Sequence, residues 1–209
     1  MPRRSSVVGT GWGGKWRRTA FPTALVPSRE LGHHRAMIAR LIADPAMARA
    51  FLSGAKRQVR VPLASPLASL APGAVVAVAE AVVPGRFASG GEVATDLRRA
   101  GHVAFADGWR RDREGAMWQG RPILDAAEKW LAAVHMPDWA CRVRLEITGV
   151  RREALQAITM GDARGEGHRG LFPRRAFVRW WDCNHPLTGL RWADGPEVVV
   201  LEVQLALGG

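Results

Sequence analysis

The sequence predicts one α+β domain with a basic arm at its amino-terminal end. Residues 139–148 alternate apolar and polar side chains as a half-exposed strand does, and 198–207 predict a strand with Val199, Leu201, Val203 and Leu205 on one face. A third stretch, 174–183, repeats its apolar residues at helical spacing. Strands in the middle and at the end of a chain, with helices between them, are typical of an α+β fold. We expect these strands to curl into a small β-barrel with short helices beside it.

Length and charge limit what kind of protein this is. The chain has 209 residues, of which 47% are hydrophobic, which is enough for one core and a tail but not for a large multidomain enzyme. The formal net charge is +11, and residues 1–60 hold 12 Lys and Arg against two acidic residues. The positive charge is therefore an amino-terminal feature, and the rest of the chain is nearly neutral.

Residues 1–32 are predicted to form a flexible basic arm, ahead of a domain that spans 33–209. The arm is rich in Gly and Arg without periodicity, so it cannot bury enough apolar surface to offset the entropy of ordering. Tryptophans alternate with cations there, a pattern that contacts phosphates and stacks on bases; arginine from GC-rich coding is an alternative explanation. The arm residues concerned are Trp12, Lys15, Trp16, Arg17 and Arg18.

The first half of the domain is predicted to contain two helices and a buried strand. Apolar residues recur at helical spacing over 35–52 with a break near Asp44, which is expected to cap the second helix. Gly54 then ends that helix. Residues 62–72, with three Pro and two Ser, predict a loop that leads into an apolar strand over 74–83.

The second half continues with short elements. Residues 85–91 predict a loop, 102–106 a strand, and 152–158 and 162–167 short helices, whereas 109–128 give no clear pattern. In the strand over 139–148, the side chains expected to face the core are Trp139, Cys141, Val143, Leu145 and Ile147.

Several classes of protein are disfavoured. Cys141 and Cys183 are 42 positions apart, which suits neither a disulfide scaffold nor a Cys-rich zinc site, so a reducing cytoplasm is expected. The longest apolar run, 72–84, is interrupted by Glu80 and is too short for a membrane helix. The six His are scattered without metal-ligand spacing. We therefore expect no metal and no cofactor.

The order of segments resembles the ASCH domain family. Residues 45–60 resemble the family's opening helix followed by Gly-x-Lys-Thr-x-Thr-x-Arg, and Pro-Gly at 72–73 with Glu80 resembles its Pro-Gly-Asp and Trp-Val-Arg-Glu. The run His-Met-Pro-Asp-Trp-Ala-Cys-Arg-Val-Arg-Leu-Glu-Ile-Thr at 135–148 is very similar to the form in phage and prophage members. The resemblance covers about 45–207.

This resemblance implies a PUA-like fold, a small β-barrel with a cleft, in a superfamily associated with RNA and modified nucleosides. Some small members hydrolyse acetylated cytidine with the motif's Lys, its second Thr and a later Glu, and ribonuclease activity is also associated with the family. Carried over, the catalytic Lys is Lys56 and the Glu is Glu166. At the position of the second Thr this sequence has Val59. Valine has no hydroxyl, so a mechanism that needs that nucleophile is not available.

The other candidate site residues surround Lys56. Lys56 is either an exposed loop lysine or a cleft residue whose pKa is lowered by burial or by neighbouring cations. Glu80 is the only charge in its apolar strand, so it is expected either to pair with an arginine of the 139–148 strand or to face Lys56 across a cleft. The full set of predicted ligand-binding residues is Lys56, Arg57, Arg60, Glu80, Arg142 and Arg144.

These residues favour a protein that binds RNA or a nucleotide-like ligand in a cleft near Lys56, Glu80 and Glu166. One alternative is a hydrolase of a modified nucleoside or RNA that uses Lys56 and Glu166 with water as nucleophile. Another is a phage accessory protein whose partner is a second protein.

Deletion of residues 1–32 tests the role of the arm. The arm holds six Lys and Arg, and each phosphate contact with a single strand contributes about −0.7 to the slope of log affinity against log salt. A salt titration of RNA binding should therefore give a flatter slope for the truncated protein, with almost unchanged thermal stability. An unchanged slope would place the phosphate contacts on the folded domain.

Overall fold

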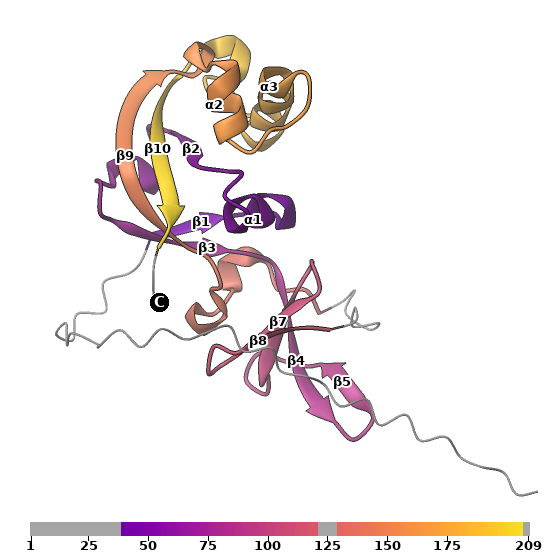
Figure 1. Ribbon diagram of the computed structural model, residues 1–209. Helices are drawn as coiled ribbons and strands as arrows, with labels where there is room; N and C mark the ends of the chain where they lie inside the picture. Colours follow the sequence, from indigo (N-terminus) through magenta and orange to yellow (C-terminus); the bar gives the residue numbers. More distant parts are fainter. Residues whose placement is uncertain (1–38, 121–128, 207–209) are drawn as a thin grey trace, which may run out of the picture.

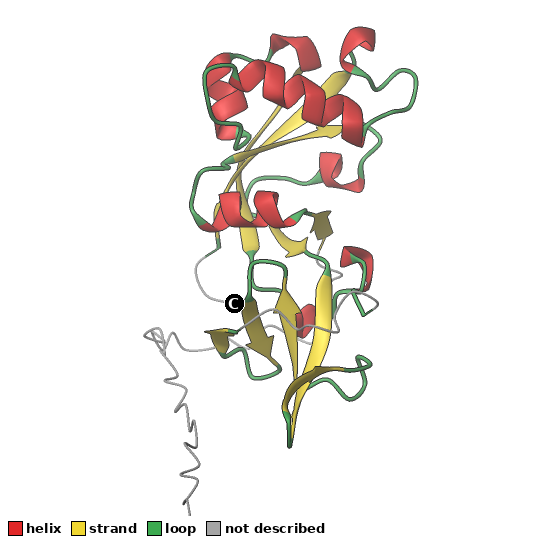
Figure 2. Cartoon of the chain, turned by 90° about the vertical axis from the view of Figure 1, so that its right-hand side faces the viewer, coloured by secondary structure: helices red, strands yellow, loops and turns green. Residues whose placement is uncertain are grey.

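The computed structural model describes residues 39–120 and 129–206 (Figure 1). The predicted arm, with Trp12, Lys15, Trp16, Arg17 and Arg18, lies outside the described residues and stays a prediction. The described chain forms two five-stranded sheets. Figure 2 shows helices gathered at the end of the molecule that the first sheet forms, while strands dominate the other end.

The first sheet is built from segments far apart in the sequence. Its edge strand β1 runs parallel to β3, and the other pairs are antiparallel. In spatial order the strands are β1 (Ala39–Ile42), β3 (Val75–Ala79), β9 (Arg144–Ala154), β10 (Glu197–Leu205) and β2 (Gln58–Pro62). The long strands β9 and β10 are visibly curved in Figure 1.

The second sheet is an antiparallel arrangement of one continuous stretch of chain. In spatial order its strands are β5 (Gly91–Ala94), β4 (Val82–Ala88), β6 (His102–Phe105), β7 (Trp109–Asp112) and β8 (Met117–Gln119). The α+β class is therefore confirmed. In place of the expected closed barrel, the first sheet is curved and open. Among the described strands, its two edge strands β1 and β2 do not pair with each other.

Three of the predicted helices are present. They are α1 (Pro45–Leu52), α2 (Met160–Gly165) and α3 (Pro173–Asn184). Asp44 caps α1 by accepting a hydrogen bond from the Met47 amide at 2.7 Å, and Gly54 follows the helix with a φ of 68°. Short 3₁₀ turns occupy Pro66–Ser69, Ala133–His135, Asp138–Ala140, Leu155–Ala157 and Trp192–Asp194.

Strand β10 is covered on both faces. On one face Val199, Leu201 and Val203 pack in a core with Phe51 of α1. On the opposite face its valines pack against the apolar side of α3, in a cluster of Val198, Val200, Phe177, Trp181, Leu155, Ile158 and Ala163. Both faces of β10 are therefore buried, one in the core that includes Phe51 and the other against α3.

Three predicted elements differ from the structure. The helix expected before Asp44 is wrong, because 39–42 forms β1, whose backbone pairs with β3. The loop expected over 85–91 is also wrong, since β4 continues to Ala88 and forms a hairpin with β5. The helix expected over 152–158 is wrong at its start, because pairing with β10 extends β9 to Ala154 before a 3₁₀ turn. In each case tertiary strand pairing overrides a local pattern.

Two predicted strands are shifted. The apolar run over 74–83 is divided at Glu80 between β3 of the first sheet and β4 of the second. The strand expected to start at Trp139 starts at Arg144, and Trp139 lies half-buried in a 3₁₀ turn. Cys141, Val143, Leu145 and Ile147 are buried as predicted.

Replacement of Trp181 or Trp139 by Ala tests this distribution of the core. Trp181 is 0% exposed, and its indole nitrogen donates to the Leu190 carbonyl at 2.7 Å. Trp181→Ala should lower the free energy of unfolding by about 3–5 kcal/mol, and Trp139→Ala by less than half as much. Urea unfolding of both variants measures the difference, and a larger loss at Trp139 would contradict the assignment.

Candidate functional site

Lys56, Glu166 and Arg60 meet in a buried ionic cluster. The Lys56 ammonium donates to Oε2 of Glu166 at 2.5 Å and to the Glu166 carbonyl at 2.9 Å. Nη1 of Arg60 donates to the other carboxylate oxygen at 3.0 Å. The three residues are 4%, 3% and 2% exposed, in the order Lys56, Glu166, Arg60. One carboxylate is therefore shared between two cations away from water.

Local structure brings these distant residues together. The Gly54 turn after α1 directs Lys56 into an isolated antiparallel bridge with Glu166. Glu166 is the C-cap of α2, which is fixed at its other end by a capping box between Thr159 and Asp162. Arg60 comes from β2. The cluster thus fastens α2 to the first sheet.

Further ion pairs extend the cluster across the sheet. Nη2 of Arg60 lies 2.6 Å from Glu153 of β9 and 3.8 Å from Asp162 of α2. Arg151 then contacts Glu153, Asp162 and Glu202 at 3.1, 3.2 and 2.7 Å. Glu153, Asp162 and Glu202 are therefore all paired with arginine side chains of the same sheet.

Aromatic rings enclose the outer side of the cluster. The Lys56 ammonium lies 5.7 Å from the Phe51 ring centroid and 5.6 Å from that of Trp180. His168 packs edge-on to Phe177, and burial together with nearby Lys56 lowers the pKa of the His168 imidazole. An imidazole with a lowered pKa is neutral near pH 7.

Val59, which stands where the sequence resemblance would place a threonine, belongs to the apolar core. It is buried on β2 in the cluster that includes Val61 and Leu201. Val59 is thus a packing residue, and its side chain supplies no hydroxyl for a nucleophilic step.

Glu80 belongs to a second ionic cluster, between the two sheets. Arg142 donates to both Glu80 oxygens at 2.8 and 2.7 Å, and its Nη2 lies 2.8 Å from Asp107. The Arg142 guanidinium also lies 3.9 Å from the Phe105 ring centroid. Burial alone would lower the pKa of Arg142, but its hydrogen bonds to Glu80 and Asp107 raise it. The structure therefore supports the arginine-pair interpretation of Glu80.

The predicted site residues are thus divided rather than gathered in one cleft. Lys56, Arg60 and Glu166 form one cluster, and Glu80 with Arg142 forms another that shares no ion pair with it. Arg57 is exposed, and Arg144 is half-buried on β9.

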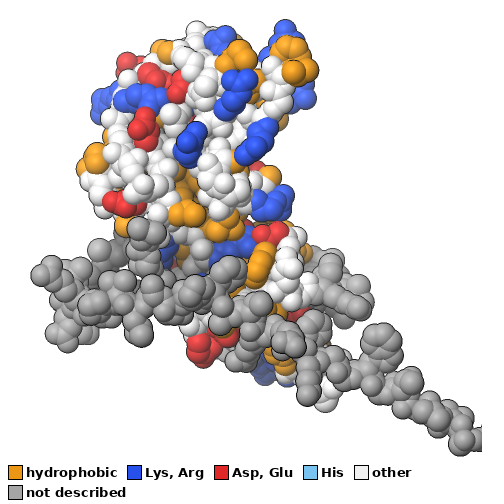
Figure 3. Space-filling model, in the orientation of Figure 1, with side chains coloured by type: hydrophobic (Ala, Val, Ile, Leu, Met, Phe, Trp, Pro, Cys, Tyr) orange, Lys and Arg blue, Asp and Glu red, His pale blue; other side chains and the backbone are white. Residues whose placement is uncertain are grey.

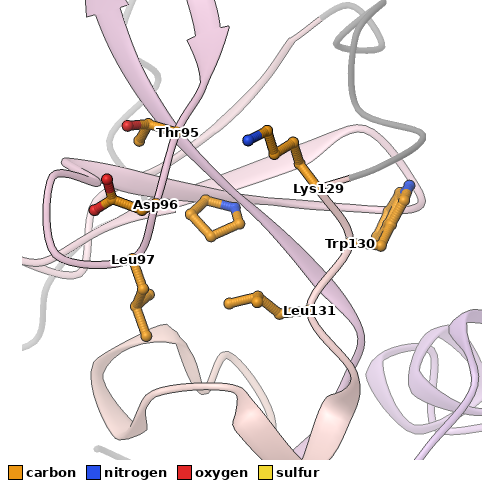
Figure 4. A pocket seen from close by; sticks show the side chains of 7 residues that line it. Thr95, Asp96, Leu97, Lys129, Trp130 and Leu131 are labelled. Atoms are coloured by element: carbon orange, nitrogen blue, oxygen red, sulfur yellow. The ribbon is translucent and has the colours of Figure 1, made fainter.

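The pocket in Figure 4 contains none of these residues. It is an open cavity of about 250 Å³ beside the second sheet. Its lining consists of Pro84, Thr95, Asp96, Leu97, Lys129, Trp130 and Leu131. Among residues 39–120 and 129–206 no three His, Cys, Asp or Glu side chains gather as a metal site. Within the same ranges no helix is long and apolar enough to cross a membrane.

Sequence reasoning missed a surface of exposed arginines on α2, α3 and the turn between them. We name it the α2–α3 arginine surface; its members are Arg164, Arg169, Arg174, Arg175 and Arg179. Figure 3 shows Lys and Arg side chains gathered over this end of the molecule. The signal in the sequence is the density of arginine over 164–179, where five of sixteen residues are Arg.

A comparison with solved structures found similar chains. No family model matches the chain, and no curated protein matches it. The chain is similar in structure to an ASCH domain. That domain, from Lactobacillus crispatus JV V101, has a TM-score of 0.38 and 14% identity, over 76% of this chain and 69% of that one.

The second structure is protein EF3133 from Enterococcus faecalis V583, described as DUF984. It has a TM-score of 0.41 and 8% identity, over 82% of each chain. Because TM-scores and identities are low, neither similarity transfers a function or a site residue. The expected phage or prophage type stays a prediction.

Removal of one partner tests the buried pair. Lys56→Met leaves a buried carboxylate short of a cation, so it should lower the free energy of unfolding by about 3–5 kcal/mol. The double variant Lys56→Met/Glu166→Leu should lose less than the sum of the single variants, because Arg60 keeps Glu153.

Lys129→Met is the matched control, because Lys129 is an exposed lysine. Urea unfolding is measured for the wild type, Lys56→Met, Glu166→Leu, the double variant and Lys129→Met. Strict additivity of the Lys56 and Glu166 variants would show that the two side chains do not interact in solution.

Proposed function

We propose that the protein binds RNA on the α2–α3 arginine surface. The observation that carries this proposal is that five exposed arginines lie there and, among described residues, none forms an ion pair with Asp or Glu. Arginine binds phosphate oxygens through a planar fork of donors and remains charged at all relevant pH values. Such a surface is suited to an RNA backbone.

The acidic residues of the same segment are turned inward. Glu166 pairs with Lys56 and Arg60, and Asp162 lies close to Arg60 and Arg151. Asp182 of α3 accepts a hydrogen bond from the Trp192 amide at 2.7 Å. The positive charge of the surface is therefore not neutralised by neighbours in sequence.

The arginines also stand on a fixed base. The ionic cluster fastens α2 to β2, and the apolar face of α3, with Phe177 and Trp181, is buried against β10. Side chains on an anchored helix pair lose less entropy when they meet phosphates than side chains on an unanchored segment. Residues 61–209 are nearly neutral as a whole, with 18 Lys and Arg against 17 Asp and Glu, yet five exposed arginines gather on this one surface.

Binding is favoured over the hydrolase alternative. Lys56 is buried and donates to Glu166 twice, so it is not directed toward a substrate. Val59 supplies no nucleophile. The Lys56–Glu166 contact is accounted for by its role in holding α2.

A charge-removal variant tests the proposal. Arg164→Gln/Arg169→Gln/Arg179→Gln in the full chain should flatten the salt dependence of single-stranded RNA binding by about 2 units of slope, because each lost phosphate contact removes about 0.7. Affinity at physiological salt should fall roughly 10- to 100-fold. Fluorescence anisotropy over a salt series measures both quantities.

The matched control removes three arginines elsewhere. Arg49→Gln/Arg86→Gln/Arg98→Gln alters exposed residues outside α2 and α3 and should leave the slope nearly unchanged. An equal effect of both triple variants would show that binding depends on net charge and not on the α2–α3 arginine surface. A wild-type protein that binds no RNA would refute the proposed function.

A further inference from the structure

Two neighbouring arginines of α3 lie over aromatic rings. The Arg175 guanidinium carbon is 5.2 Å from the ring centroid of Phe172, and that of Arg174 is 5.1 Å from the ring centroid of Trp192. Arg174 also donates to the Gln156 carbonyl at 3.0 Å. Both guanidinium groups are thus held by partners that leave the residues exposed.

Phe172 is not explained by the core. It is 63% exposed and, like its neighbour Leu171, which is 84% exposed, it belongs to no buried cluster. As the N-cap residue of α3 it makes no side-chain capping hydrogen bond. Phe172 is a large exposed ring among arginines that form no ion pair with any Asp or Glu of 39–120 and 129–206. Such a surface fits a ligand that is both anionic and aromatic.

We propose that an unpaired base of the bound RNA stacks on the Arg175–Phe172 pair, so that the protein selects single-stranded or looped RNA over a duplex. This inference rests on the proposed function and adds the kind of RNA bound. The surrounding arginines, Arg169 and Arg179, contact phosphates, while Phe172 and the guanidinium plane of Arg175 provide the stacking surface.

The chemistry of RNA accounts for the selectivity. Every nucleobase has a π face, so stacking on aromatic rings and guanidinium planes depends little on sequence. In an A-form duplex those faces are already stacked, and only loops, bulges and ends expose them. Phosphates are present in both forms, and therefore arginine contacts alone would not distinguish them.

The test compares Phe172→Ala with Leu171→Ala, an adjacent and even more exposed apolar residue without an arginine over it. Binding of the full chain to a short single-stranded RNA and to a blunt duplex of the same sequence is measured by fluorescence anisotropy. Phe172→Ala should weaken single-strand binding about tenfold, with unchanged duplex binding and an unchanged salt slope. Leu171→Ala should change neither, and Phe172→Trp should retain single-strand preference. Thermal unfolding should be unaffected, because Phe172 lies outside the core.

The results separate this inference from the proposed function. Equal losses for single strand and duplex in Phe172→Ala, or no loss in either, would overturn stacking. Loss of binding in Arg164→Gln/Arg169→Gln/Arg179→Gln without any effect of Phe172→Ala would keep the arginine surface and reject the stacked base. A wild-type protein that binds duplex as tightly as single strand would also reject the inference.

Discussion

The packing of α2 and α3 on the first sheet depends on one buried group, the carboxylate of Glu166. A buried carboxylate is costly unless cations and hydrogen bonds satisfy it, and here Lys56 and Arg60 occupy its two oxygens. Since these partners come from the turn after α1 and from β2, satisfying one charge fixes α2 against the sheet. The position of α3, packed beside α2 and β10, follows from the same contact.

A second buried pair connects the two sheets. Glu80 lies between the last residue of β3 and the start of β4, where the chain leaves one sheet for the other. Arg142 binds it bidentately just before β9 begins, and Asp107 accepts from the same guanidinium beyond β6. A charge in an otherwise apolar run thus marks the place where a strand changes sheets.

The sequence predicted those parts of the fold whose periodicity belongs to one element. The cap at Asp44, the helix over 174–183 and the strand over 198–207 were recoverable because their signals are local. Strand β1 and the β4–β5 hairpin were not recoverable. Strand β1 is defined by pairing with β3, more than 30 residues away, and the hairpin by pairing between two strands without a clear local pattern. The family resemblance predicts Lys56 and Glu166 in one site together with Glu80, and only the Lys56–Glu166 contact is found; spacing alone could not have joined residues 110 positions apart.

The arginine surface illustrates why charge in a sequence does not reveal charge on a surface. Residues 160–185 contain five Arg and three acidic residues, Asp162, Glu166 and Asp182. By net charge the segment is therefore only moderately basic. In the structure those carboxylates are engaged by Lys56, Arg60, Arg151 and a backbone amide. The same buried pair that holds α2 therefore removes negative charge from the surface. Structural anchoring and the exposure of unpaired arginine are two consequences of one interaction.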